Sequence, residues 1–444
     1  MCTFRAGELS QWVSRLWKNG MPEENITGIS HDTRTLKPGD LYVAIRGDHF
    51  DGHAFIQDAF AKGAVGALVD DAFQWSEKPI LPVHSTLKGL QDLAVGYRKK
   101  WIGTAIGITG SVGKTTVKEM CADVLSVRAD THRTAGNYNN HIGLPLTMLS
   151  MPQAMRYGVF EIGMNHPGEI GPLSDMLQPQ IGIMTDICNA HREAFHSLEE
   201  IAHEKMKLVE HVAPSGFVIL DRDSEWYALM RQHTLASVVT VSFEGVADYI
   251  GRRVNERVMK VNGFDYSMPL PGEHIMRNAL RAIALGLEMG MTPAEIREGL
   301  ARFAPPPMRW QETEIDGIHF INDAYNANPL SMRASLKTFS ELPESGKKWA
   351  VVGGMRELGT VAEEEHRALG EFIDGLGLDG VILVGELGHE IVCHGAQDVQ
   401  QCGTPAEAST FLKERLKAGD RVLLKASRGE QLEHVMGPFV KKAQ

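Results

Sequence analysis

The stretch Thr-Gly-Ser-Val-Gly-Lys-Thr-Thr at residues 109–116 decides the fold expected for this chain. An apolar run at 106–108 precedes it and apolar residues at helical spacing follow it, so we expect a strand, a loop and a helix in succession. Gly110 and Gly113 relax the backbone, so that its N–H groups and the N-terminus of the helix can face an anion. The stretch therefore predicts a phosphate-binding loop.

Two side chains of this loop carry the expected chemistry. Lys114 is expected to reach the outer phosphates of a nucleotide, and the Thr115 hydroxyl to bind Mg²⁺. Ile108 stands where the strict phosphate-loop pattern has glycine, and a simple strand–helix turn is the alternative. The residues expected to bind nucleotide here are Thr109, Gly110, Ser111, Val112, Gly113, Lys114, Thr115 and Thr116.

The composition is that of an ordinary globular protein, with 43% hydrophobic and 23% charged residues. A length of 444 residues corresponds to about three domains. The net charge of −11 argues against a protein that binds the phosphate backbone of nucleic acids. No apolar run approaches the roughly 20 residues that span a bilayer, so we expect no membrane insertion.

The cysteines and the start of the chain predict the compartment. The first seven residues lack the apolar core of a secretory signal. The cysteines are few, odd in number and without the spacing of metal ligands, which favours reduced thiols. We therefore expect a cytoplasmic protein. The cysteines are Cys2, Cys121, Cys188, Cys393 and Cys402.

Strands and helices alternate along most of the chain, which predicts an α/β fold of parallel sheets covered by helices. The pattern restarts near Ser85, and three consecutive prolines at 305–307 form a stiff connector. We therefore expect a small α/β domain at 1–85, a central domain with the phosphate loop at 86–308 and a third α/β domain at 309–444.

Five segments give local predictions. Apolar residues at helical spacing predict a helix at 9–17, and a strand is expected at 29–34. Two apolar runs predict buried strands at 157–164 and 181–187. Alternation of apolar and polar residues at 238–268 predicts antiparallel strands.

Acidic residues lie near the ends of two predicted strands, Glu161 in one and Asp186 in the other, and His191 follows in the next loop. A carboxylate in a buried strand is unfavourable unless a cation or hydrogen-bond donors meet it. Parallel sheets bind ligands outside the carboxyl ends of their strands, so Mg²⁺ beside a triphosphate is the expected cation. An ordinary buried ion pair for Glu161 and a structural role for His191 are the alternatives.

Lys205 is an unusual residue of the helix predicted at 198–212. It falls on the apolar face of this helix, whereas Lys207 falls on the polar side. Lysine is rarely buried without a partner, and a desolvated amine readily loses its charge and becomes a nucleophile. The alternative is a side chain that extends along the apolar surface to solvent.

Polar clusters mark both ends of the chain. In the first domain, Ser-His-Asp-Thr-Arg at 30–34 and Asp-Gly-His at 51–53 suit either ligand contacts or ordinary loops. In the third domain, Asp-Ala-Tyr-Asn-Ala-Asn-Pro at 323–329 follows the first strand and Lys-Ala-Ser-Arg at 425–428 follows the last. The third-domain clusters are thus expected at one edge of a sheet, where ligands bind.

Motifs spread over nearly the whole chain carry a resemblance. The phosphate loop is followed by Gly-Asn-Tyr-Asn-Asn-His-Ile-Gly-Leu-Pro at 136–145, Phe-Glu-Ile-Gly-Met-Asn at 160–165 and Ala-His at 190–191. The 323–329 segment and Met-Arg-Glu-Leu-Gly at 355–359 complete the series. In this order they resemble the Mur ligase family, the ATP-dependent amide-forming enzymes of peptidoglycan synthesis. The last two segments are nearest to members that add D-alanyl-D-alanine to a UDP-N-acetylmuramoyl-tripeptide.

The resemblance implies a fold and a reaction. It implies a UDP-substrate domain, a central ATP-binding domain and a Rossmann-like C-terminal domain. ATP is expected to phosphorylate the free carboxylate of the UDP-muramoyl peptide, and the amine of the dipeptide to attack the resulting acyl phosphate. The implied cofactors are ATP and Mg²⁺, and the implied partners are UDP-N-acetylmuramoyl-tripeptide and D-alanyl-D-alanine. We expect a monomer.

The resemblance also assigns roles to individual residues. The implied catalytic residues are Lys114, His191, Lys205 and Arg309, and the implied metal residues are Thr115, Glu161, His191 and Lys205. Lys205 is implied to form a carbamate with CO₂, which turns a buried cation into an anionic ligand. Further nucleotide contacts are implied for Asn278, Arg309 and Asp323. Substrate contacts are implied for Asp32, Thr33, Arg34, Asp51, Gly52, His53, Asn326 and Asn328.

Several positions differ from the family pattern. Asp186 replaces an asparagine, Ile275 an asparagine, Gly354 an aspartate and Ala426 a glycine. These differences leave open a related ligase that adds a different amino acid or dipeptide. A nucleotide-binding regulator of cell-wall assembly without catalysis is the other alternative.

Overall fold

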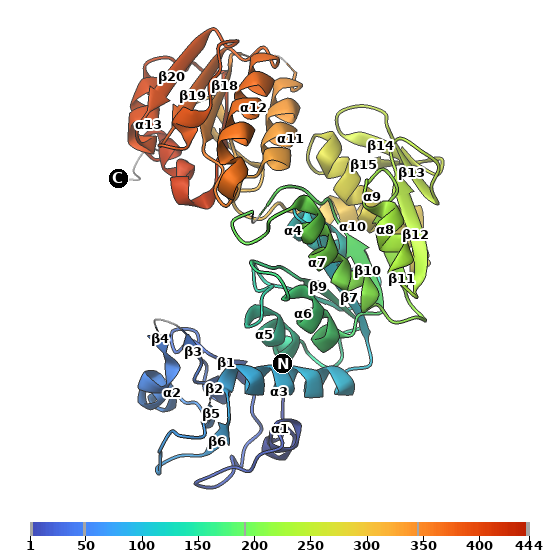
Figure 1. Cartoon of the computed structure of the whole chain (residues 1–444), viewed down its shortest axis with the longest axis vertical. Helices are drawn as coiled ribbons and strands as arrows, with labels where there is room; N and C mark the ends of the chain where they lie inside the picture. The colour runs from blue at the N-terminus through green and yellow to red at the C-terminus, as the bar shows by residue number, and fades with distance from the viewer. Residues whose placement is uncertain (1–2, 48–49, 191, 344–345, 441–444) are drawn as a thin grey trace.

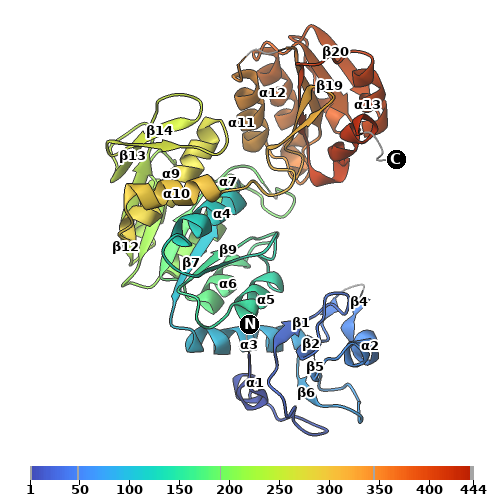
Figure 2. The ribbon, with the colours of Figure 1, turned by 180° about the vertical axis from the view of Figure 1, so that it is seen from behind.

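Three α/β units follow one another along an elongated molecule, with the N-terminal unit at one end and the C-terminal unit at the other (Figures 1 and 2). The structure is a computed structural model, and it describes residues 3–47, 50–190, 192–343 and 346–440. The predicted α/β class with three units is confirmed.

The N-terminal unit is built on a four-stranded parallel sheet in the order β1-β2-β5-β6. Its strands are β1 (Gly28–Ser30), β2 (Asp40–Val43), β5 (Gly66–Asp70) and β6 (Ile80–Val83), and the hairpin is β3 (Arg46–Gly47) with β4 (Phe50–Asp51). Its helices are α1 (Ala6–Trp12), η1 (Gly52–Phe55), α2 (Ile56–Ala61) and α3 (Thr86–Lys100).

Two local predictions in this unit were too long. The helix predicted at 9–17 ends at Trp12, because Ser14 has a left-handed backbone and the Trp17 indole turns back to donate to the Ala6 carbonyl at 2.9 Å. The strand predicted at 29–34 ends at Ser30. After it, a turn forms in which the Asp32 carboxylate accepts from the backbone N–H of Arg34.

The central unit holds a nine-stranded sheet in the order β15-β14-β13-β12-β11-β10-β7-β9-β8. Its strands are β7 (Thr104–Thr109), β8 (Thr131–Arg133), β9 (Tyr157–Glu161), β10 (Ile181–Met184), β11 (Phe217–Asp221), β12 (Ser237–Ser242), β13 (Tyr249–Arg253), β14 (Val258–Val261) and β15 (Phe264–Ser267). Its helices are α4 (Lys114–Leu125), α5 (Gly143–Ser150), α6 (Ile170–Leu177), α7 (Leu198–Glu210), α8 (Tyr227–Gln232), α9 (Glu273–Glu288) and α10 (Pro293–Arg302).

The antiparallel prediction for 238–268 is right only for its second half. Strands β13, β14 and β15 form an antiparallel meander, whereas β12 pairs in parallel with both β11 and β13. Helix α8 supplies the crossover between β11 and β12 that a parallel pair requires. Strand β12 lies inside the sheet, and its residues 239–242 are all buried, so it does not have the one exposed face that the antiparallel prediction implied.

The C-terminal unit has a six-stranded sheet in the order β16-β17-β21-β18-β19-β20, in which only β16 is antiparallel. Its strands are β16 (Gln311–Ile315), β17 (Ile318–Asn322), β18 (Lys348–Gly353), β19 (Gly380–Val384), β20 (Asp398–Cys402) and β21 (Arg421–Lys425). Its helices are α11 (Pro329–Ser340), η2 (Gly359–Val361), α12 (Ala362–Asp374), η3 (Gly388–Glu390), α13 (Pro405–Lys413), η4 (Arg428–Glu430) and η5 (Leu432–Phe439).

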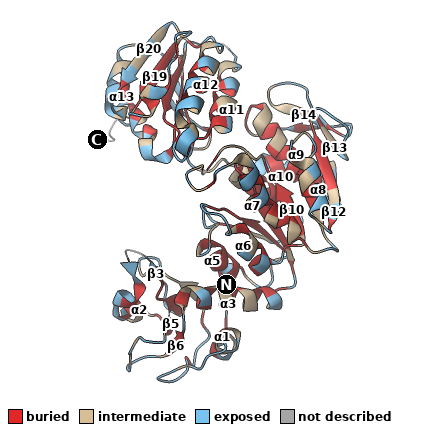
Figure 3. Cartoon of the chain, viewed as in Figure 1, coloured by how far each residue is buried: buried red, intermediate tan, exposed pale blue. Residues whose placement is uncertain are grey.

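The inner strands are buried and the covering helices keep exposed outer faces (Figure 3). Helix α3 begins at Thr86 and packs against α5 and α6 of the central unit. The domain boundaries near residues 86 and 309 stay predictions. Among the described residues, no helix is both long and apolar enough to cross a membrane.

Candidate active site

A cavity of about 550 Å³ lies between the phosphate loop of the central unit and the end of β17 in the C-terminal unit. Of the residues predicted from the sequence, the central unit contributes Ser111, Val112, Gly113, Lys114, Thr115, Thr116, Glu161 and Asn278 to its lining. The C-terminal side contributes Arg309, Asp323, Asn326 and Asn328. His191 lies outside the described residues. Thr109, Gly110, Lys205 and the six predicted N-terminal residues do not line the cavity.

The phosphate loop joins β7 to α4, as predicted. Gly113, directly before the helix, has φ +82°, and a Cβ there would lie 2.5 Å from Asn278 Oδ1. Ile108, at the position where glycine was expected, is a fully buried strand residue paired with Glu161. The loop thus begins only after Thr109, and the departure at Ile108 serves the core.

Lys114 lies over its own loop. Its ammonium donates to the carbonyls of Gly110 at 2.8 Å and Ser111 at 3.3 Å. Burial lowers the pKa of Lys114, and the nearby charge of Arg309 acts in the same direction while Glu161 opposes it. A bound anion would relieve this crowding of positive charge.

Arg309 links the two sides of the cavity. It follows the proline connector, and its Nη2 donates to the Thr115 hydroxyl at 3.3 Å. Its guanidinium also lies 4.5 Å from the centre of the Tyr325 ring. A guanidinium beside the phosphate loop suits recognition of a phosphate group.

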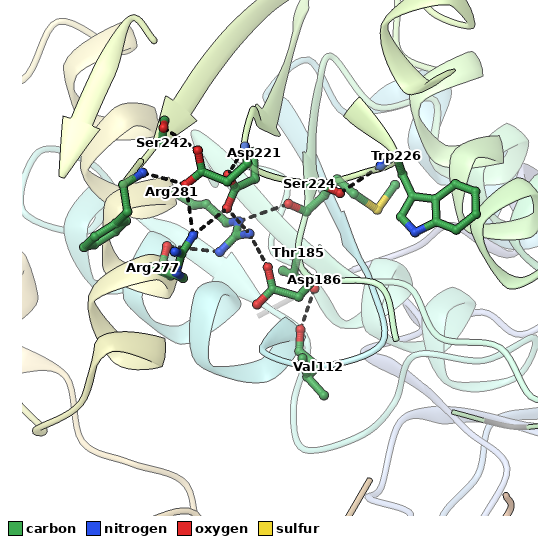
Figure 4. A network of polar contacts seen from close by, with 12 residues as sticks. Val112, Thr185, Asp186, Asp221, Ser224, Trp226, Ser242, Arg277 and Arg281 are labelled. Atoms are coloured by element: carbon green, nitrogen blue, oxygen red, sulfur yellow. Dashed lines mark hydrogen bonds and ion pairs between the residues drawn. The ribbon is translucent and has the colours of Figure 1, made fainter. Parts of the chain in front are cut away.

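Asp186 belongs to a buried network that supports the loop (Figure 4). Strand β10 ends at Met184, so Asp186 lies beyond the strand that was predicted to contain it. Its carboxylate accepts from Arg281 Nη2 at 2.6 Å, and the same guanidinium reaches Asp221 at 3.1 Å and the Met184 carbonyl at 3.1 Å. Arg281 is fully buried, so it requires these anionic partners.

The main chain of Asp186 holds the phosphate loop in place. Its carbonyl accepts from the Ser111 N–H at 2.7 Å, and the Thr185 hydroxyl donates to the Val112 carbonyl at 2.6 Å. The carboxylate at position 186, where the family pattern has asparagine, is therefore accounted for by the buried charge of Arg281.

Glu161 is buried at the end of β9, with one carboxylate oxygen left over. Oε1 accepts from Asn139 Nδ2 at 2.8 Å, whereas Oε2 is buried and has no hydrogen-bond partner among the residues that the structure describes. The predicted alternative of an ion pair is not observed for Glu161 within the described residues. An orphaned carboxylate oxygen beside a phosphate loop fits a magnesium ligand, because Mg²⁺ takes few protein oxygens and completes its shell with phosphate and water. Accordingly, the described residues contain no cluster of three or more metal-binding side chains.

Lys205 is 1% exposed on α7, so its side chain does not extend to solvent. No hydrogen bond or ion pair reaches its amine from the part of the chain that the structure describes. Burial lowers the pKa of Lys205 well below its usual value, and the nearby charge of Lys114 adds to this effect. A buried amine whose pKa is lowered in this way is the arrangement that carbamate formation requires.

The C-terminal wall contains residues with structural partners of their own. Asn328 caps α11, where its Oδ1 accepts from the Ser331 N–H at 2.9 Å. Asp323 accepts from the Trp310 N–H at 3.1 Å and pairs with Lys425 at 2.9 Å. Lys425 also lines the cavity, and its role was not predicted because its partners lie about a hundred residues away in the sequence.

His274 is a second cavity residue without a predicted role. It lies at the start of α9, beside Trp310 and within 3.4 Å of the Thr338 hydroxyl. Burial lowers the pKa of His274 to about 4, so the imidazole is neutral near pH 7. The neighbouring Asn278 has a buried Oδ1 that no described residue contacts by a hydrogen bond, which leaves an acceptor for a ligand.

The N-terminal clusters are largely engaged within their own unit. Asp51 Oδ1 lies 2.6 Å from His53 Nδ1, and His53 Nε2 accepts from the Asp70 N–H at 3.0 Å. Arg34 forms a 2.7 Å ion pair with Asp32, and strand β1 of this unit contacts helix α5 of the central unit. Strand β1, which leads into the 30–34 turn, therefore lies beside the helix that follows the Asn139 segment.

Gly354, where the family pattern has aspartate, is explained by the packing of Leu387. A Cβ on Gly354 would lie 2.1 Å from the Leu387 Cβ, so Leu387 occupies the space that a side chain at position 354 would need. Ala426 is fully buried at the end of β21. Both differences are accommodated by the core beside the cavity.

Three family models match the chain. The model for the Mur ligase middle domain matches residues 108–286, and the model for the Mur ligase, glutamate ligase domain matches residues 308–428. The model for the Mur ligase family, catalytic domain matches residues 25–98.

Relatives and solved structures match over almost the full length. A UDP-N-acetylmuramoyl-tripeptide–D-alanyl-D-alanine ligase of Bacillus subtilis is 34% identical, over 94% of this chain and 93% of that protein. A crystal structure of MurF from Acinetobacter baumannii superposes with a TM-score of 0.92 at 29% identity and covers 99% of both chains. MurF of Thermotoga maritima, solved in complex with ADP, gives 0.83 at 27% identity and covers 93% of this chain and 97% of that one. The chain therefore belongs to the Mur ligase family.

Proposed function

We propose that this protein is the ATP-dependent ligase that joins D-alanyl-D-alanine to UDP-N-acetylmuramoyl-tripeptide and so makes the pentapeptide precursor of peptidoglycan. The observation that carries the proposal is the single cavity between the phosphate loop and the end of β17. Similarity over almost the full length to proteins named UDP-N-acetylmuramoyl-tripeptide–D-alanyl-D-alanine ligase supports the choice of substrates. We further propose that the protein acts as a cytoplasmic monomer.

ATP binds with its phosphates at the loop of residues 110–116, where Lys114 and Arg309 neutralise their charge. Asn278 and Asp323 lie at the same cavity and are proposed contacts to the rest of the nucleotide. Phosphoryl transfer to a carboxylate brings like charges together, so positioning and neutralisation supply most of the catalysis.

Thr115, Glu161, His191 and a carbamate on Lys205 are the proposed magnesium residues. Among the described residues, neither Glu161 Oε2 nor the Lys205 amine has a hydrogen-bond partner, which supports this set. Carbamate formation joins the neutral Lys205 amine to CO₂ with release of one proton. Bound Mg²⁺ would neutralise the charge of the transferring phosphoryl group.

The tripeptide substrate is proposed to lie between the N-terminal unit and the cavity. Asp32, Thr33, Arg34, Asp51, Gly52 and His53 are the proposed contacts to its UDP-sugar. The contact between β1 and α5 supports a path from that unit toward Glu161. Asn326 and Asn328, on the opposite wall, are the proposed contacts to the acyl phosphate or the incoming dipeptide.

The proposed reaction proceeds in two steps. An oxygen of the substrate carboxylate attacks the γ-phosphorus of ATP, and the bond to ADP breaks. The amine of D-alanyl-D-alanine next attacks the acyl carbon, loses a proton and expels phosphate. His191 is a proposed catalytic residue of this sequence.

A two-substrate assay tests the proposal. We expect phosphate release from ATP only when UDP-N-acetylmuramoyl-tripeptide and D-alanyl-D-alanine are both present. Phosphate release that is independent of either substrate would overturn it. A panel of amino acids and dipeptides, assayed with the same UDP-peptide, distinguishes a related ligase with another amine substrate.

A further inference from the structure

Lys425 is a buried lysine at the end of β21 whose donors are all used within the protein. Its side chain is 4% exposed. Its ammonium lies 2.9 Å from Asp323 Oδ2, and it donates to the carbonyls of Asp323 at 3.0 Å and Asn326 at 2.8 Å. An ammonium has three N–H donors, so none is left for a substrate. Its task is therefore to hold the segment that follows β17.

Asp323 and the segment that follows it are hydrogen-bonded to residues 308–310, which come directly after the proline connector between the units. Its Oδ1 accepts from the Trp310 N–H at 3.1 Å, and its Oδ2 accepts from the Ser335 hydroxyl as well as from Lys425. The Met308 carbonyl accepts from the Tyr325 N–H at 3.1 Å, which adds a second tie between the same two segments.

The segment 308–310, directly after the proline connector, has strained backbone at the point where these hydrogen bonds hold it. Met308 has φ +60° and Trp310 has φ +52°, both in the left-handed region that side chains other than glycine disfavour. Arg309 lies between them, stacks on Tyr325 and donates to Thr115. Without the ties, the backbone on either side of Arg309 would relax and its guanidinium would leave the phosphate loop.

We infer that Lys425 is a positioning residue. It acts through Asp323 and the strained segment 308–310 to hold the Arg309 guanidinium at the phosphate loop. The inference deepens the proposed ligase function, and it rests on that function only for its kinetic readout. Nucleotide affinity provides a readout that does not depend on turnover.

The test compares Lys425→Met with Lys417→Met in the full chain. Lys417 is exposed in the turn before β21, so its variant matches the chemical change outside the network. We expect Lys425→Met to weaken ADP binding roughly 10-fold in calorimetry, because a charge-assisted hydrogen bond to phosphate is lost. We also expect a lower kcat, a KM for the UDP-tripeptide within about twofold of wild type, and no change for Lys417→Met.

A merely structural role would lower the Tm and leave the ADP affinity of the folded protein at its wild-type value, which would overturn the inference. If Lys425→Met does not fold, Lys425→Arg replaces it. A guanidinium keeps the charge but cannot direct three donors from one nitrogen. We expect ADP binding at least about threefold weaker for this variant, and wild-type affinity would again overturn the inference.

A double-mutant cycle tests the route through Arg309. In an Arg309→Met background, Lys425→Met should weaken ADP binding no further. Fully additive effects would overturn the route. If the wild type shows no dipeptide-dependent phosphate release, the ligase proposal fails, whereas the ADP affinities still decide the role of Lys425.

Discussion

Two sheet edges face each other across the cavity, and they treat buried polar groups in opposite ways. On the central side, three polar groups have no partner among the described residues: Glu161 Oε2 at the end of β9, Asn278 Oδ1 on α9, and the Lys205 amine on α7, which is buried but does not line the cavity. At the edge of the C-terminal sheet, Lys425 has three acceptors, and the Asp323 carboxylate meets three donors.

The difference separates chemistry from support. A buried polar group without a partner costs about 1–3 kcal/mol, so a cluster of such groups indicates that ligands complete them. Satisfied groups instead fix a geometry. We therefore expect changes at the central edge to affect activity more than stability, and changes at the C-terminal edge to disturb the placement of Arg309.

The largest expected effect is that of Lys205→Ala. Loss of the proposed carbamate should lower kcat at least about 100-fold, comparable to removing one charge-stabilising group. Added formate or acetate should restore part of the activity by replacing the carboxylate. Lys114→Ala is the matched control, with a similar loss and no recovery. Lys205→Ala without recovery would remove the carbamate from the account.

His274, between the two edges, gives a pH test. Its pKa is about 4 in the folded protein and about 6.5 when unfolded, so the unfolded chain binds the extra proton between these values. The contribution of the neutral His274 to the free energy of unfolding is therefore fully present above pH 6.5, and it is lost as the pH falls toward 4. Because the ring lies partly open to the cavity, we expect a loss of about 2 kcal/mol. Urea unfolding at pH 7.5 and 4.5 should show this loss in wild type and not in His274→Asn.

If the free energy of unfolding of the wild type and of His274→Asn depended equally on pH, the His274 imidazole would be exposed to water rather than buried in the cavity wall.

Gly113→Ala and Gly168→Ala separate strain from crowding. Both glycines have similar positive φ, +82° and +86°, but only at Gly113 would a Cβ meet another side chain, that of Asn278. Each variant should lose about 1 kcal/mol of stability from the backbone. Gly113→Ala alone should also weaken ADP binding roughly 10-fold, about 1.4 kcal/mol. Equal ADP affinities in calorimetry would show that the loop tolerates the displacement of Asn278.

The smallest expected effect is that of Asp186→Asn. The amide oxygen of the variant still accepts from Arg281, and Asp221 still neutralises the Arg281 charge. We therefore expect the free energy of unfolding in urea to fall by about 1 kcal/mol. ADP affinity should stay within about twofold of wild type. Asp175→Asn, an exposed change of the same kind, is the control. An ADP affinity reduced more than tenfold would assign the Asp186 carboxylate to the nucleotide itself.

The sequence predicted features whose determinants are local. The phosphate loop needs only eight consecutive residues, and the burial of Lys205 follows from its position on an apolar helix face. The task of Lys425 was not predictable, because Asp323 and Asn326 join it only when β17 and β21 pair. The Arg281–Asp186 pair likewise forms between α9 and the loop after β10. The error at 9–17 has the same origin, since the Trp17 contact to Ala6 follows no periodic pattern.

Oxygen transfer tests the central claim most directly. UDP-N-acetylmuramoyl-tripeptide labelled with ¹⁸O in its free carboxylate is turned over with ATP and D-alanyl-D-alanine, and the released phosphate is analysed by mass spectrometry. If the carboxylate is activated as an acyl phosphate, each phosphate released carries one oxygen from the tripeptide. Phosphate without the label would contradict the account, because the carboxylate would then never have been phosphorylated.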